Sequence, residues 1–179
     1  MTETAMRLTQ PNTAFHASWL EACHELQHAD GPNEGHGMSL ELADGDLSDP
    51  ARFTAWVSTL NDEALYPRPG RVPATNWWMV EGSEYLGAIQ LRHTLGTEYL
   101  RTHGGHVGYT VRPSARGRGL ATQALTVVLT RAHEFGLDQV MVTCLEANPA
   151  SARVIEKAGG VIEGTSDGLR RYWIPTQTK

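Results

Sequence analysis

A turn with two glycines and two arginines, in the segment VRPSARGRGLATQAL (111–125), constrains the fold of this 179-residue chain more than any other feature. A strand-like run, 106–111, leads into the turn, and apolar residues at helical spacing follow it. Such a turn exposes backbone N–H groups at the positive end of a helix, where they attract an anion. Arg116 and Arg118 destabilise that end unless an anion binds there. The turn therefore predicts a phosphate site, although a solvated basic turn has the same local pattern.

Two other phosphate motifs fit this turn less well. The P-loop requires Lys followed by Ser or Thr after its second glycine, which this turn lacks. Gly117 and Gly119 match the first two glycines of a dinucleotide fingerprint, and Glu146 follows the next strand, where a ribose-binding acid would lie. However, Thr122 replaces the third glycine, and the preceding strands are hairpin-linked rather than parallel. A dinucleotide site stays open as a remote alternative.

Hydrophobic periodicity predicts alternating helices and strands over the rest of the chain. Gly82-Ser83 and Asp167-Gly168 separate pairs of strands at hairpin spacing. The sequence predicts an α/β fold with a mixed, mostly antiparallel twisted sheet of six or seven strands and about four flanking helices. The expected helices are 11–26, 49–60, 117–135 and 149–158, and the expected strands are 6–9, 76–81, 85–95, 106–111, 139–144, 161–165 and 169–174.

Length and charge limit the class of protein. The length fits one domain, 1–179. The formal charge of −5, with scattered acids, argues against a nucleic-acid surface. The N-terminus has no secretory pattern, no apolar run approaches the roughly 18 residues of a membrane span, and the two cysteines have no ligand spacing. We therefore expect a cytoplasmic protein with no metal, no nucleic-acid partner and no membrane partner.

The segment GYTVRPSARGRGLATQAL (108–125) resembles motif A of the GNAT acetyltransferases, which is Gln or Arg, two residues, Gly, any residue, then Gly or Ala. Arg116, Gly119 and Ala121 match it. The later segment ANPASARVIEKAGG (147–160) is similar to the family's next motif, an Asn, a helix containing Ser, and Glu-Lys before a glycine. The resemblance covers roughly 105–164. It implies the GNAT fold, acetyl-CoA as cosubstrate, and N-acetyltransferase activity.

The resemblance also implies where the cofactor lies. In this family the strands before and after the motif A helix splay apart, and the pantetheine arm lies in the gap. The pyrophosphate is expected at the turn and the arm between the strand before it and the last helix. The cofactor-binding residues implied are Tyr109, Thr110, Val111, Arg116, Gly117, Arg118, Gly119, Leu120, Ala121, Asn148 and Ser151. Asn148 precedes Pro149 and can also cap that helix, and the two roles are compatible.

Acyl transfer to an amine needs stabilisation of an oxyanion and of a departing thiolate. By resemblance, the amide of Val111 or of a neighbour binds the oxyanion. Many family members protonate the thiolate with a tyrosine immediately before the Glu-Lys pair, but Ile155 stands at that position. Tyr109 or water is expected to replace it, since a thiol with a pKa of about 8.5 leaves with modest help.

The amine must also lose a proton, directly or through water, to a general base. His106, expected on the strand that faces the cleft, has a near-neutral pKa. Glu146, at the end of the opposite strand, would need a raised pKa or a bridging water. His93 and Glu84 are further alternatives if the hairpin that carries them leans over the acceptor site.

In similar proteins the first two helices and their loop select the acceptor, which here corresponds to about 11–75. Trp77 and Trp78 point to opposite faces of a strand, so only one can line a cleft. We expect the primary amine of a small molecule as acceptor. The alternatives are a protein N-terminus or lysine, or a non-catalytic acyl-CoA sensor, and a homodimer is an open alternative to a monomer. The loop acids that could attract a cation, or could simply be solvated, are Asp30, Glu34, Asp44 and Asp46.

Overall fold

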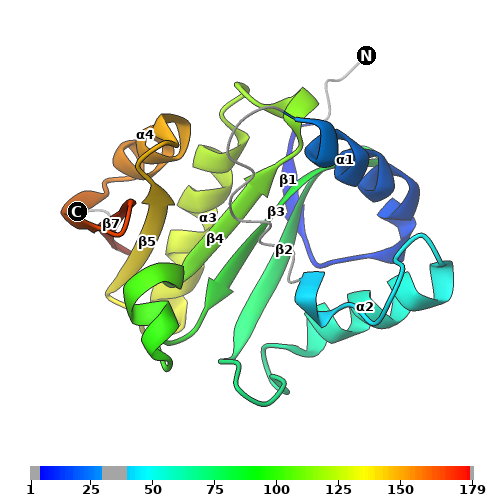
Figure 1. The fold of residues 1–179 in the computed structure, drawn as a ribbon, viewed down its shortest axis with the longest axis horizontal. Coiled ribbons are helices and arrows are strands. Elements are labelled where there is room, and N and C mark those ends of the chain that lie inside the picture. The colour runs from blue at the N-terminus through cyan, green and yellow to red at the C-terminus, as the bar shows by residue number, and fades with distance from the viewer. Residues whose placement is uncertain (1–4, 30–39, 178–179) are drawn as a thin grey trace.

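The computed structural model describes residues 5–29 and 40–177 and contains a seven-stranded sheet in the order β1-β2-β3-β4-β5-β7-β6 (Figure 1). Only β4 and β5 are parallel neighbours; the other five pairs are antiparallel. The strands are β1 Arg7–Thr9, β2 Ala74–Glu81, β3 Glu84–Arg92, β4 Val107–Val111, β5 Gln139–Leu145, β6 Val161–Ser166 and β7 Leu169–Pro175, and the α-helices are α1 His16–His28, α2 Pro50–Asp62, α3 Leu120–Glu134 and α4 Pro149–Lys157. The predicted α/β fold is confirmed.

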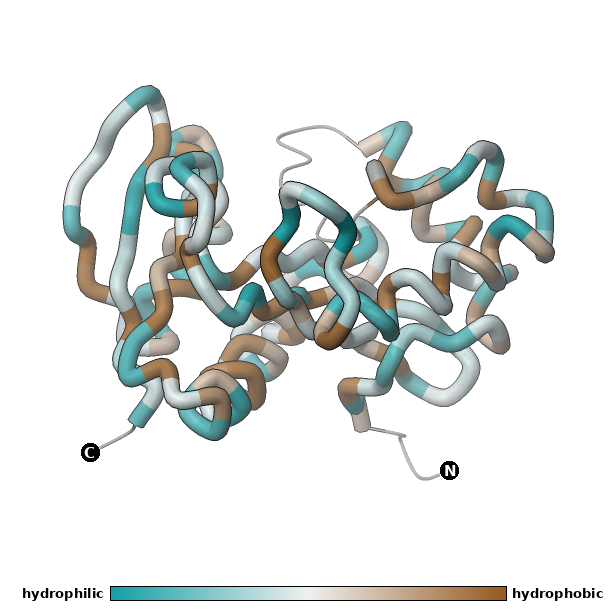
Figure 2. The backbone as a smooth tube through the Cα atoms, turned by 90° about the horizontal axis from the view of Figure 1, so that it is seen from below, coloured by the Kyte–Doolittle hydropathy of each residue, from teal (hydrophilic) through white to brown (hydrophobic). Residues whose placement is uncertain are grey.

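The helices begin where the sequence provides a cap. The side chain of Asp49 accepts a hydrogen bond from the backbone N–H of Arg52, with Pro50 in the first turn of α2. Asn148 caps α4 in the same way, with Pro149 in the first turn. In Figure 2, brown and teal residues alternate along the coils, as expected for helices that bury one face.

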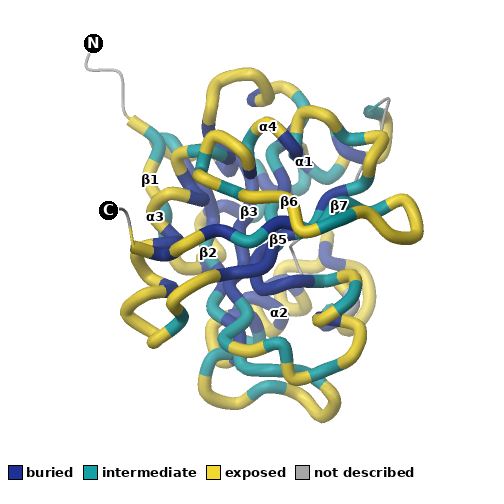
Figure 3. The backbone as a smooth tube through the Cα atoms, turned by 90° about the vertical axis from the view of Figure 1, so that its left-hand side faces the viewer, coloured by how far each residue is buried: buried dark blue, intermediate teal, exposed yellow. Residues whose placement is uncertain are grey.

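The sheet separates two hydrophobic clusters. Strand residues that point alternately to its two faces join helices α3 and α4 on one side and helices α1 and α2 on the other, which lie on the left and right of Figure 1. Figure 3 shows buried strand segments (dark blue) in the middle of the molecule, while β6 is exposed along most of its length. Following the expectations from the sequence, we call the α3–α4 side the cofactor side and the α1–α2 side the acceptor side.

The structure adds elements that the sequence pattern did not predict. A five-residue π-helix, Leu100–Gly104, lies between β3 and β4, and a 3₁₀ turn, Pro113–Ala115, lies between β4 and the glycine turn. The predicted strand 85–95 ends earlier, at Arg92. Short helical turns carry little periodic signal, which is why the sequence did not reveal them.

Among the described residues, no helix is long and apolar enough to cross a membrane. No group of three or more His, Cys, Asp or Glu side chains in the same residues is arranged to hold a metal ion.

Candidate active site

The parallel strands β4 and β5 share a single registered pair, Val107 with Val142, and diverge beyond it. We call the space between the diverging strands the gap. The N–H of Arg112 donates to the carbonyl of Leu86 at 2.8 Å, and the N–H of Arg92 donates to the carbonyl of His106 at 2.7 Å. Since antiparallel strands alternate the direction of their backbone groups, residues 108 and 110 of β4 turn theirs toward β3. The backbone groups of 109 and 111 therefore point into the gap.

This alternation divides the three β4 residues predicted to contact the cofactor. Tyr109 and Val111 direct their backbone groups to the gap and pack their half-buried side chains against the cofactor-side cluster. Thr110 is buried, and its backbone groups point toward β3. Thr110 consequently does not offer the gap a backbone contact, in contrast to its predicted role.

The glycine turn presents unsatisfied donors at the start of α3. Gly119 is the N-cap residue, with φ 77°, and it has no side chain to cap the helix. The first intrahelical bond runs from the N–H of Gln123 to the carbonyl of Gly119, so the three preceding N–H groups, of Leu120, Ala121 and Thr122, have no acceptor within the helix. The first turn of α3 contains no acidic residue. The turn therefore retains the free donors and positive potential that an anion requires.

The two arginines of the turn differ. Arg116 is exposed, and its Nε donates to the carbonyl of Val111 at 3.2 Å, which keeps it beside the gap. Arg118 donates through Nη2 to both oxygens of Glu81, each at 2.9 Å. Its charge is thus already compensated by Glu81 from β2, a partner that sequence reasoning missed. Of the two arginines, Arg116 is therefore the cation at this helix start that a bound anion would compensate.

A tyrosine hydroxyl bridges the gap to α4. The hydroxyl of Tyr109 lies 2.7 Å from Oγ of Ser151, and the carboxamide oxygen of Asn148 accepts a hydrogen bond from the N–H of Ser151 at 3.1 Å. Ile155 is one helical turn beyond Ser151 and is fully buried in the cofactor-side cluster. The hydroxyl of Tyr109 therefore reaches α4 from β4 at Ser151, one helical turn before position 155, where many family members have a tyrosine.

His106 lies just outside β4, whereas the predicted strand 106–111 began at this residue. It directly precedes β4 and is 5% exposed, beside the one registered pair of β4 and β5. Its Nδ1 accepts a hydrogen bond from the N–H of Met141 at 2.9 Å. Burial, with a smaller contribution from the charge of Arg92, lowers the pKa of His106 to about 4. Its available lone pair is used and protonation is unfavourable, so this geometry disfavours His106 as the base.

The other base candidates lie in different places. Glu146 is exposed and immediately follows β5, and its backbone N–H donates to the carbonyl of Gly168 at 2.8 Å. Nε2 of His93 is hydrogen-bonded to Oγ1 of Thr75 at 2.8 Å, and the ring stacks on Phe135, which follows α3. Glu84 is exposed at the start of β3. Only Glu146 borders one of the strands that form the gap.

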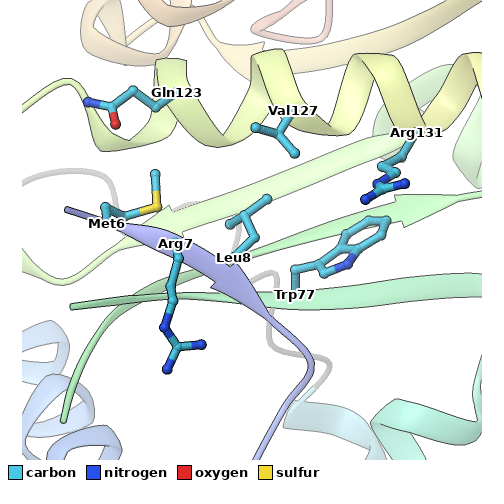
Figure 4. Close-up of a pocket in the computed structure, with 7 residues that line it drawn as sticks. All are labelled: Met6, Arg7, Leu8, Trp77, Gln123, Val127 and Arg131. Carbon is cyan, nitrogen blue, oxygen red and sulfur yellow. The ribbon is translucent and has the colours of Figure 1, made fainter. Parts of the chain in front are cut away.

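The residues expected to select an acceptor lie in several separate places. Trp78 is buried in the acceptor-side cluster, whereas Trp77 lines a groove of about 270 Å³ between β1 and α3 (Figure 4), so the predicted opposite orientation is confirmed. Asp46 accepts hydrogen bonds from the N–H and hydroxyl of Ser48, which lower the pKa of its carboxyl. Asp44 borders a groove on α2. Asp30 and Glu34 lie outside the described residues.

Diverging parallel strands followed by the donor-rich start of a helix define a class of α/β protein with a candidate anion site. Within that class, residues 42–161 match the model of the acetyltransferase (GNAT) domain. The chain therefore belongs to the GNAT family and is an acetyl-CoA-dependent N-acetyltransferase. Sequence comparison with curated proteins finds no match.

Solved structures share the fold at low sequence identity. RimJ of Mycobacterium smegmatis, in complex with CoA-disulfide, is 21% identical, with a TM-score of 0.65, over 95% of this chain and 81% of that chain. A chimera of the spermidine N-acetyltransferase SpeG from Vibrio cholerae and hSSAT is 12% identical, with a TM-score of 0.60, over 96% and 95%. A Salmonella typhimurium acetyltransferase that modifies the N-terminal serine of ribosomal protein L7/L12 is 15% identical, with a TM-score of 0.60, over 98% and 96%.

Proposed function

We propose that this enzyme acetylates the primary amine of a small molecule, with the pantetheine arm of acetyl-CoA in the β4–β5 gap and its pyrophosphate on the turn 116–122. The observation that supports this most is that the N–H groups of Leu120, Ala121 and Thr122, in the turn that follows β4, have no acceptor within α3. Arg116 provides the nearby uncompensated cation of the turn. Residues 11–75 provide the acceptor side and 105–164 the cofactor side of one domain, 1–179.

Acetyl-CoA supplies the acetyl group as a thioester, which an uncharged amine attacks directly. The N–H of Val111, which points into the gap, stabilises the negative charge that develops on the carbonyl oxygen. Tyr109 donates its hydroxyl proton to the departing thiolate and is reprotonated through Ser151. Glu146, exposed at the end of β5, accepts the amine proton through water.

The acceptor assignment has less support than the cofactor site. The spermidine enzyme and the ribosomal-protein enzyme named above have the same fold, so the fold is compatible with either kind of acceptor. The formal charge of −5 favours encounter with a cationic amine over an anionic one. A protein N-terminus is the second candidate.

The test is calorimetric titration of acetyl-CoA into the wild type and a Gly119→Glu variant. The new carboxylate would repel the pyrophosphate, so binding is expected to fall at least about 100-fold. Gly136→Glu is the matched control: Gly136 follows α3 at its other end, has φ 80°, and has no atom within 4 Å of an added Cβ, so its backbone strain and charge change are comparable. Equal loss in both variants, or none in Gly119→Glu, would contradict the proposed site.

The acceptor is identified by the release of free coenzyme A thiol with a panel of spermidine, amino acids and short peptides. Turnover with small amines supports the proposal, and turnover with peptides alone supports the protein acceptor. Binding of acetyl-CoA without turnover of any amine would favour the non-catalytic sensor.

A further inference from the structure

A carboxylate on α1, one of the two helices of the acceptor side, reaches the segment that leads into the turn 116–122, which we call the cofactor turn. Arg112 follows β4 directly and is 8% exposed. Its Nε and Nη2 donate to Oε1 of Glu25, on α1, at 3.1 and 2.5 Å. Nη1 of the same guanidinium donates to Ser18 Oγ at 3.3 Å and to the carbonyl of Tyr85 at 3.2 Å. The guanidinium is therefore fixed between α1 and β3.

The same carboxylate also binds the backbone of the 3₁₀ turn that leads into the turn 116–122. The N–H of Ser114 donates to Oε2 of Glu25 at 2.9 Å, and the hydroxyl of Ser114 donates to Oε1 at 3.0 Å. These bonds, with Arg112 as the largest cause, lower the pKa of Glu25 to about 2, so it is ionised at neutral pH. Ser114 lies in the 3₁₀ turn immediately before Arg116.

The turn is otherwise tied by the ion pair of Arg118 with Glu81 and by the bond from Arg116 to the carbonyl of Val111. Gly117 and Gly119 are in the left-handed region and are exposed, which leaves the backbone adaptable. An anion site built from backbone N–H groups binds more tightly when those groups are held in place beforehand, because less conformational entropy is lost on binding. A residue that fixes the entrance to the turn therefore controls the affinity of the whole site.

We propose that Glu25 is a positioning residue that holds the cofactor turn from α1, so that acetyl-CoA binding and the placement of the acceptor-side helix are coupled. This inference rests on the proposed location of the pyrophosphate at 116–122. Because coupling between two sites is reciprocal, cofactor binding also stabilises α1. Binding of acetyl-CoA therefore fixes the position of α1 on the acceptor side.

Electrostatic repulsion alone predicts the opposite change in acetyl-CoA affinity from the positioning role, so the direction of the change distinguishes the two. A carboxylate near the turn repels the anionic cofactor, so its neutralisation alone should tighten binding. The positioning role predicts weaker binding. Glu21→Gln is the matched control, because Glu21 is on the same helix, is 69% exposed and lies 3.7 Å from Arg112 Nη2.

The experiment measures the Kd of acetyl-CoA by calorimetry for the wild type, Glu25→Gln and Glu21→Gln. We expect the Kd to rise about 5- to 20-fold in Glu25→Gln and less than about twofold in Glu21→Gln. Hydrogen exchange of 16–28 should slow on acetyl-CoA binding in the wild type and not in Glu25→Gln, which a general loss of stability would not produce. Turnover with an identified amine should show a raised KM for acetyl-CoA at little-changed kcat.

Unchanged or tighter binding in a folded Glu25→Gln variant would overturn the positioning role. If that variant does not fold, Ser114→Ala, which removes one hydroxyl contact and keeps the ion pair, is expected to raise the Kd about two- to threefold, and no change would overturn the proposal. A wild type that does not bind acetyl-CoA would contradict the proposed cofactor site instead.

Discussion

The two sides of the sheet are stabilised and organised differently. The cofactor-side cluster is mainly aliphatic, and its candidate site comes from two short continuous segments, 108–122 and 146–151. The acceptor-side cluster is rich in aromatic residues. Its buried polar groups come from distant positions: Glu63 receives hydrogen bonds from Arg71, Asn76 and Gln90. A site of local backbone groups leaves a readable sequence motif, whereas a side assembled from distant side chains does not.

The largest expected effect tests the aromatic cluster. Trp78 is 1% exposed and contacts Tyr85, Trp56 and Phe53, with ring centroids 5.2, 6.2 and 6.1 Å apart. Trp78→Ala should lower the free energy of unfolding by about 4 kcal/mol, the usual loss for a buried Trp. Urea denaturation measures it. Trp77→Ala, on the opposite face and half-buried, should cost less than about 1.5 kcal/mol. Similar losses of unfolding free energy in the two variants would show that burial in the aromatic cluster adds no more stability than the half-buried position of Trp77.

The next effect concerns chemistry on the cofactor side. Tyr109→Phe should lower kcat about 100-fold with little change in the KM for acetyl-CoA, because it removes a proton donor and keeps the packing. Steady-state kinetics measures both values. Tyr172→Phe is the control: Tyr172 is on β7, and its hydroxyl donates to Glu156 of α4 at 3.1 Å, one turn beyond the proposed site. A kcat loss in Tyr172→Phe equal to that in Tyr109→Phe would remove the reason to assign Tyr109 a chemical role.

The sequence predicted the helices and strands well because their signals are local. Helical and strand periodicity, the caps Asp49 and Asn148 and the hairpin glycines each act over a few residues, and all the predicted helices and strands are present. The direction of the β4 backbone groups was not predicted for Thr110, because it depends on the pairing of β4 with β3. The bridge from Tyr109 to Ser151 joins residues 42 positions apart and has no local pattern.

The predictions that depended on long-range contacts were less accurate. His106 has the residue type of a base, but its burial and its bond to Met141 are set by β5. The sequence pattern of Arg118 resembles that of Arg116, and Glu81, 37 residues away, distinguishes them. Charge and residue type are properties of the sequence, whereas desolvation and partners are properties of the fold.

His106 gives a pH-dependent comparison with the base candidates. Its folded-state pKa of about 4 lies below its ordinary value of about 6.5, so the unfolded chain takes up a proton first as the pH falls. Its contribution to stability is full above about pH 6.5 and is lost as the pH falls toward 4. Between pH 7.5 and 5.5 the wild type should lose about 1.4 kcal/mol more stability than His106→Gln, as measured by denaturation at each pH.

The same variant tests catalysis. If His106 is structural, His106→Gln should retain kcat/KM within about tenfold and keep the acidic limb of the pH profile. Loss of that limb together with a much larger fall in kcat/KM would restore His106 as the base and set aside Glu146.

The smallest expected effects separate the two arginines of the turn. Arg116→Ala should raise the Kd of acetyl-CoA about fivefold, because it removes a cation that no carboxylate in the described residues contacts. Arg118→Ala should raise it less than about threefold, since Glu81 already holds that guanidinium. Glu81→Gln should then tighten binding slightly by releasing Arg118 toward the turn, and calorimetry at low salt measures all three. If Glu81→Gln weakens binding instead, Glu81 supports the turn from β2 as Glu25 does from α1, and both sides of the sheet contribute to the cofactor site.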